Sequence, residues 1–489
     1  MAKRDWYFSR LLVTAACGAV FCTASAAELT PEQAKRDAGI LVETLRALHP
    51  ALDKYSPPAM VEANFQRFTS RAHAARSPAE MYLAATELAA SVRCGHTWTN
   101  VLNQQGAIKA QLLEAPDKLP VTLALVEGRW LVLGSMAAGI HPGDELISID
   151  RQPASAVIAR MMPYLRADGA SDGKRLRQLS HGRDDYSMMD IVWPLISPPS
   201  NGHYQLEIAR SGVANRVIAA PAVTLAARTT SLAQQGIKPA SAEWSLRIDG
   251  NRAIMTLPTF SVYRSKLNWK SFFAENFAAL RRSKAEHLII DIRANEGGDG
   301  AIVLDLLSYL VKQPATYVAD QSVTMYERVP YKLARYLDTW DDGFFDRTGL
   351  VDPITDGPQA GRLRFRPNAN KTVVIIPQEN RFQGRVWLLI GPENSSATFA
   401  LAKLAKQLGA ATLVGQASGG NQRGLNGGQL AWVNLPHSGV AVDVPLLAAS
   451  YQVDTPDASV APDIVVAPRF KQRAAGHDEE MEAVMKANR

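Results

Sequence analysis

Two short turns carry residue types that could perform chemistry, and each follows a run of apolar residues. The first turn spans 291–300 and reads DIRANEGGDG. Its glycines let the backbone approach a ligand closely, and their amide groups can point at an anion. A flexible connection between a strand and a helix has the same composition, so this turn alone supports both interpretations equally.

The second turn spans 391–398, reads GPENSSAT, and opens a helical pattern that continues to Leu408. A serine at a helix N-terminus is most often a cap. It can also be a nucleophile, because the helix dipole and the first free amides stabilise developing negative charge. A serine hydroxyl needs a base near neutral pH, and His96 is the best placed of the nine histidines. On its own, His96 would be interpreted as a structural histidine.

The elements around both turns predict an α/β core. Apolar runs at 288–292, 386–390 and 411–414 are typical of buried parallel strands, and helical patterns follow the first two. Ligands of such sheets bind at the carboxyl ends of the strands, where both turns lie. The alternation of strand and helix patterns covers residues 245–470.

A small helical cap is predicted over residues 28–105. Two helix starts occur there, TPEQ at 30–33 and SPAE at 77–80. Each has a capping residue, a proline at the first helical position and Glu or Gln two residues later. Apolar residues at helical spacing follow both starts, so we expect a capping box at each.

Residues 118–222 show short β-like runs separated by turn residues. Within them, AGIHPGDELISID at 138–150 resembles the turn and strand beside the carboxylate-binding site of a PDZ domain, although a Pro-Gly turn entering any strand would look similar. The stretch 161–199 is longer than such a domain needs and has no assigned fold. We expect deletion of 118–222 to affect substrate choice more than folding. The candidate peptide-binding residues of this turn are Gly139, Ile140, Gly143 and Asp144.

The first 27 residues predict a secretory signal peptide. Basic residues precede an apolar run at 11–22 that is too short to span a bilayer, and a cleavage site follows Ala26 or Ala27. Lipid attachment at Cys17 is an alternative. We therefore expect an exported protein, periplasmic or secreted, without stable membrane insertion. Cleavage would leave Cys94 as the only thiol, so no intrachain disulfide is expected.

The composition excludes several classes of protein. The chain has 489 residues, 47% hydrophobic and 20% charged, which is ordinary for a globular protein and unlike a disordered or collagenous one. A formal charge of +6 without a Lys/Arg cluster of five or more argues against nucleic-acid binding. Because the sequence has neither an H-E-x-x-H motif nor a cysteine cluster, we expect no metal and no other cofactor.

Four motifs, in this order, resemble the tail-specific, or C-terminal processing, serine peptidases. They are CGHT at 94–97, IIDIRANEGG at 289–298, SATFALAKLAKQLGAATLVGQASGG at 396–420 and APDIVV at 461–466. The PDZ-like segment has its usual place between the first two. The resemblance implies a crotonase-like or Clp-protease-like α/β spiral core over 245–470, preceded by the helical cap and the PDZ-like domain and followed by a C-terminal tail at 471–489.

The resemblance also implies roles for residues of the two turns. Ser396 matches the family nucleophile, and Ser395 is the adjacent alternative. The amide of Ala397 and that of Gly297 or Gly298 would form the oxyanion hole.

The base is implied in the same way. One branch of the family uses a lysine, but Asn421 occupies that position here. The other branch, which resembles the tricorn core protease and interphotoreceptor retinoid-binding protein, uses the histidine of the G-H-T motif, and His96 fits that role. A glutamate usually orients this histidine, whereas this sequence offers Asp454 and Asp457. Either could substitute, or the site could work as a Ser/His dyad.

These residues predict acyl transfer, in which Ser396 attacks a peptide carbonyl and His96 passes the proton to the leaving amine. The expected substrate is a peptide or protein that the PDZ-like segment would bind as an added strand. Two alternatives are a catalytically silent peptide- or apolar-ligand-binding protein on the same fold and acyl-coenzyme A chemistry, which export argues against. The sequence does not define the oligomeric state.

Overall fold

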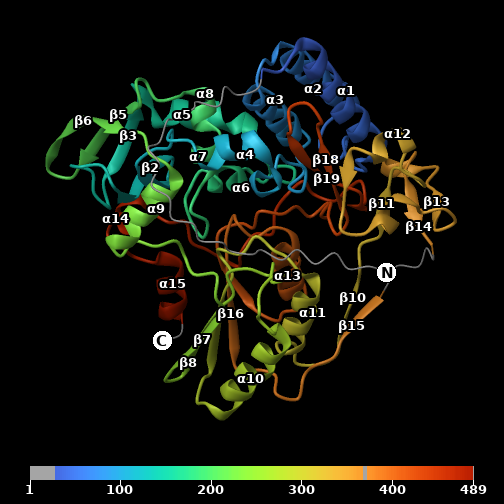
Figure 1. The fold of residues 1–489 in the computed structure, drawn as a ribbon. Coiled ribbons are helices and arrows are strands. Elements are labelled where there is room, and N and C mark those ends of the chain that lie inside the picture. The colour runs from blue at the N-terminus through green and yellow to red at the C-terminus, as the bar shows by residue number, and fades with distance from the viewer. Residues whose placement is uncertain (1–27, 367–371, 488–489) are drawn as a thin grey trace, which may run out of the picture.

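The computed structural model describes residues 28–366 and 372–487. The predicted signal peptide, its cleavage site and Cys17 therefore lie outside the described residues. Figure 1 shows a helical region at the upper right, an antiparallel sheet at the upper left, and a second sheet with its helices below them.

The N-terminal region is helical, as its capping signals predict. The Thr30 hydroxyl accepts a hydrogen bond from Gln33 N, and the Gln33 side chain accepts one from Thr30 N, which confirms the first capping box. Ser77 accepts from Glu80 N, but the Glu80 carboxylate accepts from Arg76 N, so only half of the second box forms. The helices of this region are α1 (Pro31–Leu48), α2 (Pro58–Ala74), α3 (Pro78–Ser91), η1 (Val101–Asn103) and α4 (Gly106–Leu113).

The region expected to be PDZ-like contains one antiparallel sheet with two different edges. Leu123 N and Leu125 N donate to the side chains of His181 and Ser180, so the chain at 180–181 covers the first edge. The strand at the other edge pairs with one neighbour only among the described strands. The sheet order is β1 (Val121–Val126), β2 (Arg129–Ser135), β3 (Glu145–Ile149), β5 (His203–Arg210) and β6 (Val213–Pro221), and β4 (Gln152–Pro153) pairs with β3.

Short helices fill the stretch 161–199, whose fold the sequence left undefined. They lie between β4 and β5 in sequence, and Arg166 and Lys174 of this stretch reach Glu296 and Glu393 in the two turns of the α/β core. The helices around this stretch are α5 (Ala154–Met161), η2 (Met162–Tyr164), α6 (Asp172–Arg177), α7 (Met188–Ile191) and α8 (Trp193–Ile196), and α9 (Leu225–Gln234) follows β6.

The second sheet is the predicted α/β core. Neighbouring strands are parallel, except that the strand at one edge is antiparallel to the next. The three apolar runs form strands whose ends lie within one residue of the prediction, which is thereby confirmed. The order is β21 (Ile464–Val465), β17 (Thr412–Gly415), β16 (Arg385–Ile390), β9 (His287–Asp291), β8 (Arg252–Thr256) and β7 (Ser245–Asp249).

Helices cover both faces of this sheet. α10 (Trp269–Arg282), α11 (Gly300–Ser308) and α13 (Ser396–Gln407) pack with Leu288, Ile290 and Leu388 on one face. α15 (Glu479–Ala487) packs on the other, where Val484 contacts the cluster around Trp387. The segment predicted as a C-terminal tail, 471–489, thus includes a helix that covers this face, because alternate residues of the buried strands need cover on both faces.

Between the main strands, the chain forms three small sheets and several short helices. The sheets are β10 (Ala315–Val318) with β15 (Thr372–Ile375); β13 (Val351–Pro353), β14 (Leu363–Phe365), β11 (Ser322–Thr324) and β20 (Ala448–Ala449); and β12 (Leu337–Asp338), β18 (Leu430–Asn434) and β19 (Ala441–Pro445). The helices are α12 (Tyr331–Ala334), η3 (Asp342–Phe345), η4 (Gly357–Gln359) and α14 (Phe470–Ala474).

One apolar cluster joins regions that the sequence suggested were separate. It contains Leu41 and Met81 of the helical region, Leu206 of the antiparallel sheet, and Val433 and Val442 of β18 and β19, all nearly inaccessible to solvent. Removing 118–222 would expose the remainder of this cluster. The expectation that its deletion affects substrate choice more than folding therefore conflicts with the packing.

Candidate active site

Ser396 is the first residue of α13, directly beyond the turn that follows β16. Its φ is +50°, in the left-handed region that residues with a side chain rarely adopt. Such strain is often found where a functional side chain must be presented. Ser395, the alternative nucleophile, donates its hydroxyl to the Glu296 carbonyl at 3.1 Å, so its oxygen is already engaged.

The buried side chain of Asn394 joins the two turns that the sequence singled out. Its Nδ2 donates to the carbonyls of Ile292, at 2.5 Å, and Asn295, at 2.9 Å. Its Oδ1 accepts from Gly391 N at 2.8 Å. Because a buried amide with three such bonds has little freedom, the nucleophile turn is fixed against the glycine turn.

The structure brings His96 to Ser396, although 300 residues separate them in sequence. Nε2 of His96 lies 3.3 Å from Oγ of Ser396. Burial lowers the pKa of His96, and the negative charge of Asp168 partly opposes this effect. The imidazole is therefore neutral near pH 7, which is the form that can accept a proton.

The glycine turn approaches the nucleophile closely. Gly297 and Gly298 have φ values of +119° and +138°, and a Cβ on Gly297 would lie 2.7 Å from Cβ of Ser396. The Gly297 amide donates to Oδ1 of Asn295 at 2.9 Å. Within the described residues, the amides of Gly298 and Ala397 have no such acceptor. Of the three expected oxyanion donors, these two are free to bind a ligand.

Neither of the two expected acidic residues hydrogen-bonds to His96. The Asp457 carboxylate accepts from Ala170 N at 2.8 Å and from Asn421 Nδ2 at 2.7 Å. Asn421 thus uses the position of the family's lysine to hold a carboxylate and cannot act as a base. Nδ1 of His96 is buried and has no hydrogen-bond partner in the described part of the chain.

A charged network that the sequence did not reveal supports the glycine turn. The Glu296 carboxylate accepts from Arg166 Nη2 at 2.7 Å and from Lys174 Nζ at 2.8 Å, and Lys174 also lies 3.3 Å from Glu393. Burial would raise the pKa of Glu296, but the two cations outweigh it and hold that pKa below its usual range. Arg166 and Lys174 lie in the stretch 161–199, so this stretch forms ion pairs with both the glycine turn and the turn before Ser396.

In the turn that was predicted to be PDZ-like, the hydrogen-bonding groups are engaged within the chain. Ile140 N and Gly143 N donate to the carbonyls of Ala137 and Val132. Asp144 is buried and accepts from Arg210 Nε at 2.6 Å, and the Gly139 carbonyl accepts from Arg210 at 3.3 Å and from Arg216 at 2.8 Å. The geometry therefore gives Gly139, Ile140, Gly143 and Asp144 a structural role in the turn.

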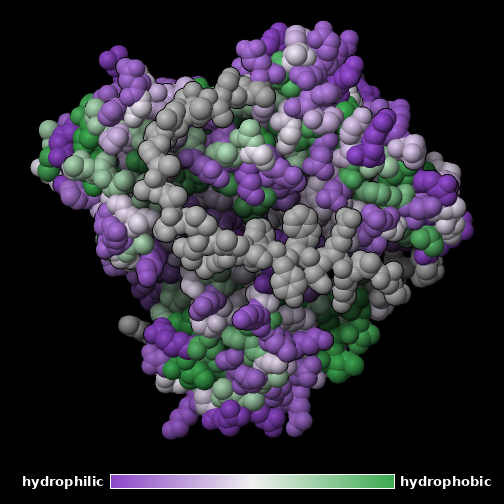
Figure 2. Space-filling view, in the orientation of Figure 1, coloured by the Kyte–Doolittle hydropathy of each residue, from purple (hydrophilic) through white to green (hydrophobic). Residues whose placement is uncertain are grey.

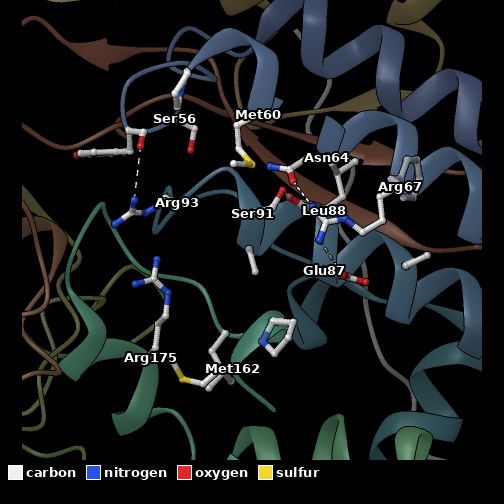
Figure 3. Close-up of a pocket in the computed structure, with 17 residues that line it drawn as sticks. Ser56, Met60, Asn64, Arg67, Glu87, Leu88, Ser91, Arg93, Met162 and Arg175 are labelled. Carbon is white, nitrogen blue, oxygen red and sulfur yellow. Dashed lines mark hydrogen bonds and ion pairs between the residues drawn. The ribbon is translucent and has the colours of Figure 1, made fainter. Parts of the chain in front are cut away.

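The cavity in Figure 3 lies apart from Ser396, between α2, α3 and η2, and has a volume of about 460 Å³. Figure 3 shows Arg93 and Arg175 pointing toward each other at one end and Arg67 beside Glu87 at the other. Arg175 is paired with Asp172, and Arg93 lies 3.9 Å from Asp457. Since acidic residues already balance these arginines, the cavity does not indicate a charged ligand.

The part of the chain that the structure describes has neither a cluster of metal ligands nor a membrane-spanning helix. No three His, Cys, Asp or Glu side chains lie together as metal ligands would. No helix there has the length and apolar content needed to cross a membrane.

Comparisons with known proteins agree with the geometry. Residues 251–466, which include the core sheet from β8 onward and both turns, match the model of peptidase family S41. Mature CPAF complexed with lactacystin is 15% identical, with a TM-score of 0.61 over 94% of this chain and 97% of that chain. Mature CPAF alone is also 15% identical, with a TM-score of 0.60 over 94% of this chain and 96% of that chain.

At this identity the solved structures show a shared fold. No curated protein sequence matches the chain. The family model covers Ser396, the turn that presents it and the glycine turn against which it packs. Residues 251–466, which hold Ser396 and both turns, therefore resemble peptidase family S41, which includes tail-specific serine endopeptidases.

Proposed function

We propose that this chain is an exported peptidase that hydrolyses peptide bonds with Ser396 as nucleophile and His96 as general base. The observation that carries the proposal is the 3.3 Å separation of His96 Nε2 and Ser396 Oγ at a helix N-terminus. Hydrogen-bond contact between a nucleophile and a neutral imidazole is the geometry that serine activation requires.

The chemistry follows from the groups around Ser396. Its Oγ attacks the substrate carbonyl carbon while His96 Nε2 takes the hydroxyl proton, and the free amides of Gly298 and Ala397 stabilise the oxyanion. The C–N bond then breaks as His96 returns the proton to the leaving amine, and water hydrolyses the acyl-enzyme by the same route. Each oxyanion donor contributes about a hundredfold to a thousandfold to such a reaction.

Peptide recognition in this proposal uses the open edge of the antiparallel sheet. Among the described strands β6 pairs with β5 alone, and it lies at the left edge of the molecule in Figures 1 and 2. Its Val213 and Val217 are exposed, while residues 180–181 cover the β1 edge. An extended substrate segment would therefore add to β6 as a strand.

Val217→Lys should raise KM for a protein substrate without changing the rate at which a small probe labels Ser396. Val318→Lys, at an exposed valine of β10, is the matched control and should leave KM unchanged.

A fluorophosphonate probe tests the proposed nucleophile. The protein should be labelled near neutral pH, and Ser396→Ala or His96→Ala should abolish labelling. Ser395→Ala is the matched control and should retain it, because that hydroxyl is bonded to Glu296. Labelling of the Ser396→Ala variant, or none of the folded wild type between pH 6 and 9, would overturn the assignment.

The second candidate is a catalytically silent ligand-binding protein on the same fold. The unpartnered Nδ1 of His96 is the observation that favours it, because an imidazole without an acidic partner is a weaker base. Stable binding of peptides by an unlabelled wild-type protein would support this function.

Export is tested separately from catalysis. The full-length chain, expressed with an intact secretion pathway, should accumulate outside the cytoplasm with an N-terminus at residue 27 or 28. Retention of Met1 on the cytoplasmic protein would contradict export and leave the peptidase proposal unaffected.

A further inference from the structure

Asp168 is a buried carboxylate in the stretch 161–199, and the mechanism above does not use it. Its solvent exposure is 0%. Oδ1 accepts a hydrogen bond from Gly95 N at 2.9 Å, while Oδ2 is buried without a hydrogen-bond partner in the described part of the chain. The carbonyl of the same Gly95 accepts a hydrogen bond from Arg166. The residue before His96 is thus held at both its N–H and its C=O.

The free carboxylate oxygen lies close to the backbone that carries the imidazole. A Cβ built on Gly95 would lie 2.7 Å from Asp168 Oδ2. Nδ1 of His96, like this oxygen, is buried and unpartnered among the described residues. A buried charge without a partner is costly, so such a carboxylate is retained where a positive charge forms during function.

We propose that Asp168 is the acidic positioning residue of this active site, the role for which the sequence offered Asp454 and Asp457. Its hydrogen bond to Gly95 fixes the main chain before His96. Its negative charge stabilises the imidazolium that forms when His96 takes the proton of Ser396. The proposal rests on the proposed function, because it assumes that His96 is the base.

Among the charged groups around His96, Asp168 is the carboxylate without an ion pair in the described part of the chain. Burial has the largest effect on the His96 pKa and lowers it; Asp168 and Glu296 raise it, and Arg166 and Lys174 lower it. Glu296 is paired with both of these cations, at 2.7 and 2.8 Å. Asp168 has no ion pair of this kind within the described residues. Lys54 and Arg175 interact with its charge without forming a salt bridge, so its attraction for a proton at His96 is offset less directly than that of Glu296.

Asp168→Asn is the matched test, because asparagine can keep the acceptor for Gly95 N while removing the charge. We expect kcat/KM on a peptide substrate to fall by at least about tenfold at its plateau. The acid limb of the pH profile should also move to lower pH, since loss of the negative charge lowers the His96 pKa. Asp457→Asn is the control and should leave the acid limb in place.

A second variant and a direct titration make the outcome independent of activity. Gly95→Ala should displace the Asp168 carboxylate, because the added Cβ would lie 2.7 Å from its Oδ2, and should likewise move the acid limb to lower pH. The His96 pKa, measured by NMR on the folded proteins, should be lower in Asp168→Asn than in wild type even if no substrate is cleaved. An unchanged His96 pKa in folded Asp168→Asn, or a shift in Asp457→Asn instead, would overturn the assignment, whereas absence of labelling at Ser396 would overturn only the proposed function.

Discussion

Gly427 lies against the imidazole of His96, the proposed base, and filling its side-chain position tests whether this ring must stay where it is. A Cβ at this residue would lie 3.1 Å from Nε2, 3.2 Å from Cε1 and 3.3 Å from Cδ2 of His96. Carbon atoms in contact normally keep about 3.5–4.0 Å apart, so the ring must move by roughly 0.4 Å. The φ of Gly427 is outside the left-handed region, and alanine therefore adds no backbone strain.

The size of the effect follows from this displacement. A misplacement of about 1 Å costs about a hundredfold in rate, so a shift of roughly 0.4 Å predicts about a sixfold loss for Gly427→Ala. Valine adds two more methyl groups at the same place, which a shift of that size cannot accommodate. Gly427→Val should therefore lose more than about a hundredfold.

The assay is the second-order rate constant for fluorophosphonate labelling of Ser396, measured with the urea midpoint of each variant. Gly300→Ala is the control, because no atom lies within 4 Å of a Cβ built there. Labelling of a folded Gly427→Val variant at the wild-type rate would refute the reasoning, because the ring contact would then have no bearing on proton transfer.

Four further outcomes are expected. Ser396→Gly should be more stable to urea than Ser396→Ala by about 0.5–1 kcal/mol, because the relief of backbone strain at φ +50° outweighs the entropy cost of glycine. A glycine variant less stable than the alanine variant would show that the backbone is not strained there. Burial lowers the pKa of His96, so kcat/KM should stay flat through neutral pH and fall only below about pH 6.5, and an acid limb above that value would exclude His96 as the base. Cys94→Ser should keep its activity within about threefold, and Cys94 should resist thiol reagents in the native protein, since burial raises its pKa. Deleting 118–222 should abolish cooperative unfolding, because one apolar cluster spans this segment and the helical region, and a folded remainder would show the cluster to be divisible.

The sequence predicted those elements whose formation depends on residues close together in the chain. The cap at Thr30 and the three buried strands follow from residue types only a few positions apart, and all were found in the structure. Ser396 and His96 were identified because each stands in a short motif next to a recognisable element. Their contact depends on the tertiary fold, which brings residues 300 positions apart together.

The groups that the sequence missed have no local signature. Asp168 stands in a stretch without clear periodicity, and its significance comes from Gly95, 73 residues earlier. Asp457 was favoured by register, but Asn421, which replaces the family's lysine, binds its carboxylate. The sequence suggested the Gly297 amide as an oxyanion donor, yet this amide donates its hydrogen bond to the side chain of Asn295, two residues before it. Each outcome depends on which buried donor reaches which acceptor, and only tertiary contacts decide that.

Catalysis in this chain therefore depends on more than the part that matches the family model. Residues 251–466 hold Ser396 and the free amides, but the proposed base comes from the turn after α3. β18 and β19, inside that range, bury Val433 and Val442 in the cluster shared with the helical region. A fragment limited to 251–466 would both lack the proposed base and expose the apolar residues of β18 and β19. Trp98, two residues after His96, pairs with Asp443 of β19 through two backbone hydrogen bonds, so the packing that stabilises β19 also helps to place the proposed base.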